Sequence, residues 1–234
     1  MKALLQVENL YAGYGQSEVV RDLSFTVGEG EVVALLGPNG AGKTTTLMTV
    51  SGLLPALRGR IRLFGSRIDA RTPHRNAQRG LAHVTEGRSL FGGLTVRENL
   101  HLAARSRRLT EVGEYFPPLE ALMDRRAGLL SGGEQQMLAI ARAIVSRPKL
   151  LMIDEMSLGL APVVLERLAV TVRRIVERTG IGILMVEQHV PVALSVADRA
   201  ILLRHGRAVA EGTATSLALR PDVLHAGYLA QTGH

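Results

Sequence analysis

Short apolar runs alternate with longer amphipathic stretches along this chain of 234 residues. Three of the runs are continuously apolar, at residues 32–36, 150–153 and 181–186. Strands that are covered on both faces lack the in-and-out alternation of half-exposed strands, so these runs predict buried parallel strands. Their alternation with helical stretches is typical of an α/β sheet with crossover helices.

Four other segments mix polar residues into an apolar pattern, at residues 4–10, 19–27, 60–64 and 200–209. Together with their turn residues, this pattern predicts a more exposed flank of antiparallel strands.

Two helix starts carry a capping box, in which a hydroxyl residue is followed three positions later by Glu. They are Thr95 with Glu98 and Ser131 with Glu134. The helix after Ser131 must end before Pro148, and a proline at position 162 suits the first turn of a helix reaching about residue 178.

More than a hundred residues separate the first two buried runs, which is too many for one crossover. We therefore expect a single domain over residues 1–234, with an inserted, mainly helical subdomain at about residues 88–146. No internal repeat or low-complexity linker divides the chain.

Composition narrows the possible chemistry. Apolar residues make up 46% of the chain, but its longest uncharged stretches are too short to cross a bilayer. There is no Cys, which excludes disulfides, thiolate zinc sites and cysteine catalysis, and the N-terminal apolar run ends too early for a secretory signal. A cytoplasmic location is expected. The net charge of +7 suggests anionic neighbours such as phosphates, nucleic acid or a lipid-lined surface, with a genome-wide preference for Arg as the alternative. The few aromatic residues disfavour base-stacking surfaces.

The clearest motif follows the first buried run directly and precedes a helical stretch. It matches the phosphate loop GxxxxGK[ST] and consists of Gly37, Pro38, Asn39, Gly40, Ala41, Gly42, Lys43 and Thr44, with Thr45 next in the chain. Backbone amides and the helix N-terminus would surround a nucleotide's phosphates. Lys43 would bridge the outer phosphates, and the Thr44 hydroxyl would ligate Mg²⁺.

The second buried run ends in two acids, Asp154 and Glu155. The sheet would bring this strand's carboxyl end beside the phosphate loop. Asp154 would then hold Mg²⁺ through its water shell, and Glu155, pointing the other way, would polarise the attacking water. The alternative is a strand that simply leaves the core with charged residues.

A second anion site is predicted where Ser131, Gly132 and Gly133 open a helix, because glycines leave amides and a hydroxyl at the positive end of its dipole. The alternative is a plain helix cap.

The order of phosphate loop, Leu-Ser-Gly-Gly segment and strand with Asp-Glu resembles the ATPase subunits of ABC transporters over essentially the whole chain. The resemblance implies an α/β P-loop NTPase (RecA-like) core with an antiparallel β flank and an inserted helical subdomain. It also implies Mg²⁺-dependent ATP hydrolysis by two chains packed head to tail. In that arrangement Ser131, Gly132 and Gly133 contact the ATP held by the other chain, residues 157–160 couple the two sites, and Tyr14 stacks on adenine.

The chain departs from the family at two positions. Glu86 stands where the family has Gln in the loop that senses the transmembrane partner. Gln188 follows Val186 and Glu187 at the place of the switch His, with His189 one position later. Counting back from residues 197–199 favours Gln188 for the switch role and leaves His189 as the alternative. Glu86, Gln188 and His189 join Lys43 and Glu155 as candidate catalytic residues.

The loop at residues 85–88, the segment 90–100, the Val-Glu-Gln run and the tail 223–229 look like the smaller ATPase of branched-chain amino-acid importers. Relatives that handle urea or other amides look similar. This resemblance implies a second ABC ATPase as partner, identical or not, together with integral permease subunits and, indirectly, a solute-binding protein. It places the chain on the inner face of the cell membrane.

A soluble ABC-type ATPase acting on ribosomes or nucleic acid is an alternative. The argument for it is a cluster of arginines at Arg58, Arg60, Arg62, Arg67, Arg71, Arg75 and Arg79. Such proteins generally carry two fused ATPase units, and this chain has one, so no nucleic-acid partner is expected. A regulatory nucleotide-binding module without turnover is a third alternative, which Glu155 argues against.

Overall fold

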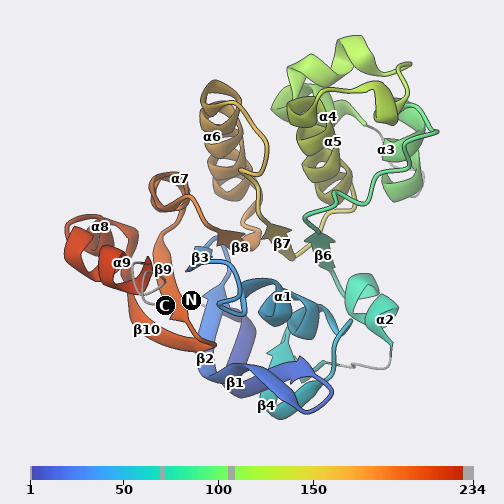
Figure 1. Ribbon diagram of the computed structural model, residues 1–234. Helices are drawn as coiled ribbons and strands as arrows, with labels where there is room; N and C mark the ends of the chain where they lie inside the picture. The colour runs from blue at the N-terminus through green and yellow to red at the C-terminus, as the bar shows by residue number, and fades with distance from the viewer. Residues whose placement is uncertain (1, 69–71, 105–108, 229–234) are drawn as a thin grey trace.

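The computed structural model describes residues 2–68, 72–104 and 109–228, with the side chains of 110, 111 and 225 left out. Residue 71 of the arginine cluster and residue 229 of the predicted tail lie outside these ranges. The described strands form two sheets, one of six strands and one of four (Figure 1).

The six-stranded sheet has the order β10-β9-β3-β8-β7-β6. Its strands are β3 (Val32–Leu36), β6 (Leu81–Val84), β7 (Leu150–Asp154), β8 (Gly182–Glu187), β9 (Arg199–Arg204) and β10 (Arg207–Thr213). All are parallel except β10, and every residue of β3, β7 and β8 is buried. The three predicted buried parallel strands are confirmed.

The four-stranded sheet is wholly antiparallel and has the order β2-β1-β4-β5. Its strands are β1 (Ala3–Tyr14), β2 (Ser17–Gly28), β4 (Ala56–Leu63) and β5 (Ser66–Arg67). The antiparallel flank is therefore confirmed for three of its four predicted segments.

The prediction for residues 200–209 is wrong. β9 pairs in parallel with β3, its central residues are buried, and only β10 is antiparallel to it. The polar residues that suggested exposure belong to the turn at residues 205–206 and to the edge strand β10.

The helices are α1 (Lys43–Ser51), α2 (Pro73–Gln78), α3 (Val96–Ala104), α4 (Thr110–Tyr115), α5 (Gly132–Val145), α6 (Pro162–Thr179), α7 (Val190–Val196), α8 (Ala214–Ala218) and α9 (Pro221–Tyr228). The 3-10 helices η1 (Pro117–Leu122) and η2 (Ala127–Leu129) precede α5. None of the described helices is long and apolar enough to span a membrane.

Helices α3 to α5 lie together, away from the antiparallel sheet, at the upper right of Figure 1. Both predicted capping boxes are present, and α5 ends before Pro148. Pro162 opens α6. The bounds of the inserted subdomain and the assignment of the whole chain to one domain stay predictions.

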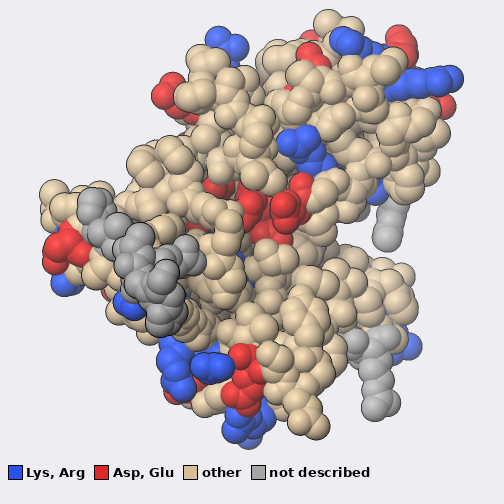
Figure 2. Space-filling view, viewed as in Figure 1, with Lys and Arg blue, Asp and Glu red and all other residues tan. Residues whose placement is uncertain are grey.

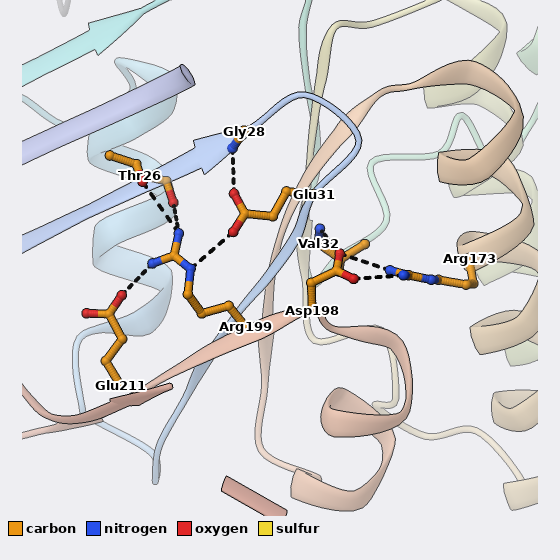
Figure 3. A network of polar contacts seen from close by, with 8 residues as sticks. All are labelled: Thr26, Gly28, Glu31, Val32, Arg173, Asp198, Arg199 and Glu211. Atoms are coloured by element: carbon orange, nitrogen blue, oxygen red, sulfur yellow. Dashed lines mark hydrogen bonds and ion pairs between the residues drawn. The ribbon is translucent and has the colours of Figure 1, made fainter. Parts of the chain in front are cut away.

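A polar network joins the two sheets to α6 (Figure 3). Arg173 of α6 donates to both carboxylate oxygens of Asp198, at 2.7 and 2.9 Å, and Asp198 accepts from the Val32 amide at 2.9 Å. Arg199 donates to Glu31 and to the Thr26 carbonyl of β2. The network fixes the start of β3, which carries the phosphate loop at its other end.

Candidate nucleotide-binding and catalytic site

The predicted phosphate loop connects β3 to α1. Gly37 has φ +151°, and a Cβ there would lie 2.3 Å from the Leu203 carbonyl oxygen, so only glycine fits. Gly42 has φ +99° and precedes α1 without a side-chain cap, which leaves the helix amides open to an anion. Lys43 is buried, and its Nζ donates to the carbonyls of Gly37 (2.9 Å) and Pro38 (3.1 Å). Burial lowers the pKa of Lys43, although nearby carboxylates oppose this shift.

Asp154 ends β7 beside the loop, as the sheet topology predicts. Its Oδ1 accepts from the Thr44 hydroxyl at 3.2 Å. Burial, together with the charges of Glu155 and Glu86, raises the pKa of Asp154 from 3.8 to about 6, against the opposing effects of the Thr44 hydrogen bond and the Lys43 charge. A buried carboxylate and a hydroxyl at this distance are hard oxygen donors of the kind that Mg²⁺ prefers.

Glu155 follows β7 directly, and its backbone departs from the extended conformation of the strand. Its backbone has φ +51°, a left-handed conformation that costs free energy in a non-glycine residue and is often found at functional sites. Gln188 Nε2 donates to Glu155 Oε1 at 2.5 Å. The first residue after β8 therefore contacts the first residue after β7.

An open pocket of about 300 Å³ brings together nine of the 18 predicted site residues. It is lined by Val19, Asn39, Gly40, Gly42, Lys43, Thr44, Thr45, Glu86, Glu155, Leu158 and Gln188. Acidic side chains gather in a hollow at the middle of the face seen in Figure 2. Pro38 and Ala41 lie on another side of the loop, against α9.

Other predicted residues lie apart from this pocket in the described part of the chain. Tyr14 is 53% exposed, and its hydroxyl donates to Met48 Sδ at 3.6 Å. His189 is exposed at the start of α7 and does not line the pocket, whereas Gln188 does.

The Ser131 segment opens α5 and is also absent from the pocket lining of the described chain. Ser131 is exposed, its Oγ accepts from the Glu134 amide, and Glu134 Oε2 accepts from the Ser131 amide at 2.7 Å. Packing also explains why residue 133 is a glycine, because a Cβ there would lie 2.8 Å from Val164 Cγ1 on α6.

One buried contact escaped the sequence analysis. Glu187, fully buried at the end of β8, accepts from the amide (2.9 Å) and hydroxyl (2.6 Å) of Ser157. Burial raises its pKa. The contact joins the loop after Glu155 to the residue before Gln188. The signal was an apolar strand ending in an acid, as at Asp154.

Arg88 was also missed as a link between loops. Its guanidinium donates to Gln136 and Gln135 of α5, each at 3.0 Å, and to the Leu158 carbonyl at 3.3 Å. It therefore connects the segment after Glu86 to the start of α5 and to the loop at residues 157–160.

Two arginines of the cluster on and near β4 make internal contacts. Arg58 lies 4.1 Å from the centre of the Tyr11 ring and pairs with Glu18. Arg79 donates to the Leu63 carbonyl and lies over Phe64.

Comparisons with known proteins agree with this geometry. Residues 20–157 match the protein family described as ABC transporter. The chain is 40% identical to the high-affinity branched-chain amino acid transport ATP-binding protein BraG of Pseudomonas aeruginosa, covering 94% of this chain and 97% of BraG. It is 36% identical to the lipopolysaccharide export system ATP-binding protein LptB of Escherichia coli, with 92% of each covered.

Solved structures agree as well. A nucleotide-free ATP-binding cassette from an ABC transporter has a TM-score of 0.84 at 25% identity, covering 95% of this chain and 98% of that one. An ATP-binding subunit of an ABC transporter has a TM-score of 0.80 at 33% identity, with 94% of each covered. The predicted fold class is confirmed. The chain belongs to the ABC transporter family, as an ATP-binding and ATP-hydrolysing subunit.

Proposed function

We propose that the chain drives uptake of a small polar solute, a branched-chain amino acid, as a peripheral subunit on the cytoplasmic face of the membrane. The observation that carries this is its similarity to BraG over nearly the full length of both proteins. The loop at residues 85–88 and the Val-Glu-Gln run at residues 186–188 support import of this kind. Urea or another amide is the second solute class.

For the nucleotide, we assign the phosphate contacts to the loop amides and Lys43, and the adenine contact to Tyr14. Thr44 and Asp154 would hold Mg²⁺, since their oxygens lie together and the acids around them would repel a bare triphosphate. A cation held by these two residues would supply charge neutralisation for the outer phosphates.

Hydrolysis is assigned to Glu155, which would polarise the attacking water as general base. Gln188 donates to Glu155 and so fixes the carboxylate within the pocket. Glu86 lines the same pocket, and we assign to it the role of sensing the membrane partner. His189 remains the alternative to Gln188 for the switch role.

The site is completed by a second chain, identical or a sister ATPase. Ser131, Gly132 and Gly133 lie outside the chain's own pocket, at an exposed helix N-terminus suited to phosphate. We assign them to the γ-phosphate held by the partner, with residues 157–160 coupling the two sites. Membrane permease subunits complete the importer, and a solute-binding protein delivers the cargo to them.

For the permease we propose an open groove of about 590 Å³ between β6 and helices α3 and α5. Leu102, 57% exposed, and the half-buried His83 line it. Neither His83 ring nitrogen has a hydrogen-bond partner in the described chain, and burial lowers its pKa to about 4, so the ring is neutral. The lining mixes apolar residues with the basic side chains Arg79, Arg88, Arg142, Arg147 and Lys149. A mixed groove of this kind fits a helix end from the permease, whose carbonyls would meet the basic side chains. Arg88 lines the groove and links it to α5.

Tagged chain purified from gently solubilised membranes tests the proposal. We expect two multispanning proteins and a second ATPase, with ATP-dependent leucine uptake after reconstitution. Leu102→Glu should remove the multispanning proteins, whereas Leu219→Glu, which changes an even more exposed leucine after α8, should retain them. Uptake of urea instead of leucine would change the solute class. A lipid-export complex or no membrane partner would contradict import.

A further inference from the structure

Tyr228, the last residue of α9, lies between two loops of the nucleotide pocket. Its hydroxyl accepts from the Gly37 amide at 3.0 Å and donates to the Gln188 carbonyl at 3.3 Å. Gly37 opens the phosphate loop after β3, and Gln188 follows β8, which pairs with β3. A single hydroxyl therefore connects the ends of two neighbouring strands.

The helix that carries Tyr228 is closely fitted to the sheet. Gly227 lies against β9, where a Cβ would come within 2.3 Å of Leu202 Cδ2. Arg204 donates to the Ala226 carbonyl at 3.2 Å, and Leu224 is buried. These contacts determine where the phenol lies, so its position between the loops is built into the fold.

The hydroxyl suits this position because a phenol can accept and donate at the same time. Burial raises the pKa of Tyr228 to about 12, so the phenol keeps its proton at physiological pH. No side chain at position 37 could act as the donor in place of the backbone amide, because the Leu203 carbonyl occupies the place of a Cβ.

Gln188 in turn contacts Glu155, the acid that follows β7. The backbone of Gln188 accepts from Tyr228, and its side chain donates to Glu155. We propose that Tyr228 is a positioning residue for ATP hydrolysis, which holds Gln188 and, through it, Glu155 in register with the phosphate loop. The proposal rests on the roles given above to Gln188 and Glu155 and adds the C-terminal helix to the machinery.

Steady-state hydrolysis of Mg-ATP by the full chain tests it. Tyr228→Phe keeps the ring and removes the hydroxyl. We expect kcat to fall about three- to tenfold, with KM within about twofold, because geometry at the reacting end changes and nucleotide binding does not. Tyr11→Phe, which removes a phenol hydroxyl on the antiparallel sheet, should leave both constants unchanged.

A double-variant cycle separates positioning from a general loss of structure. In a Gln188→Ala background, Tyr228→Phe should have little further effect on kcat. A full loss in that background, or normal turnover of Gln188→Ala beside reduced turnover of Tyr228→Phe, would overturn the coupling. Failure of the transport proposal would instead appear as hydrolysis without uptake and would leave this comparison intact.

Amide hydrogen exchange at Gly37 gives a readout that does not need turnover. Tyr228→Phe should speed exchange of this amide about tenfold, with the melting temperature of the chain unchanged. Unchanged exchange together with unchanged kcat would overturn the proposal.

Discussion

The N-termini of α1 and α5 are both rich in glycine, yet they differ in how they are capped. The start of α1 has no side-chain cap, and Lys43, Thr44 and Asp154 surround it. The start of α5 is closed by its own capping box and faces outward. The first helix start is built to hold an anion within this chain. The second can meet one only when another chain presents it, and that contact would compete with the cap.

The largest effect is expected at the α1 end, from Glu155→Gln. The change keeps size and the capacity to accept from Gln188 but removes the charge of the general base. Turnover should fall by about 100-fold or more, while ATP still binds and holds two chains together. Phosphate release and size-exclusion chromatography with Mg-ATP measure the two quantities. Unchanged turnover would contradict the role of Glu155.

Lys43→Ala should come next, since it removes the buried cation of the phosphate loop. We expect ATP affinity to fall about 10- to 100-fold, equivalent to about 1.4–2.7 kcal/mol. Equilibrium binding of a fluorescent ATP analogue measures it. Arg147→Ala, outside the pocket, is the matched control, and equal loss in both variants would contradict the assignment.

The raised pKa of Asp154 predicts that the stability of the fold depends on pH. Its folded pKa of about 6 lies above the 3.8 of an ordinary Asp, so the folded chain binds the proton more tightly than the unfolded chain. This group's contribution to stability is therefore present at low pH and is lost as the pH rises through 6. Without Mg²⁺, Asp154→Asn should stabilise the fold by about 1–3 kcal/mol at pH 7.5, but less at pH 5.

Urea unfolding at the two pH values, with a chelator present, measures this difference. Hydrolysis by Asp154→Asn should nevertheless be lost. Glu86→Gln is a milder control, since removing the Glu86 charge should lower the pKa of Asp154. A stability difference that is independent of pH would contradict the assignment.

The smallest effect is expected from Arg88→Ala, which disconnects the loop after Glu86 from α5. Basal turnover should fall by less than about threefold, while stimulation of turnover by the permease should be lost. ATPase rates with and without the reconstituted permease measure both. Retained stimulation would show that Arg88 does not carry the signal.

Local patterns predicted the α1 end well and the links between loops poorly. The phosphate loop is contiguous, and β3 and β7 are apolar throughout, so their burial followed from the sequence. The wrong assignment of residues 200–209 arose because polarity does not reveal the direction of strand pairing. Tyr228 and Gly37 are 191 residues apart, and the contact of Glu187 with Ser157 needs two strands in register. Such contacts depend on the assembled sheet.

The central claim is that the α5 end of one chain completes the α1 end of another. Mixing two inactive variants, Ser131→Trp and Glu155→Gln, tests it most directly. Each mixed pair would contain one site with an intact Glu155 from one chain and an intact Ser131 from the other. The account predicts recovery of about one quarter of wild-type hydrolysis, because about half of random pairs are mixed and each has one intact site of two. No recovery in mixtures that form ATP-bound pairs would contradict it.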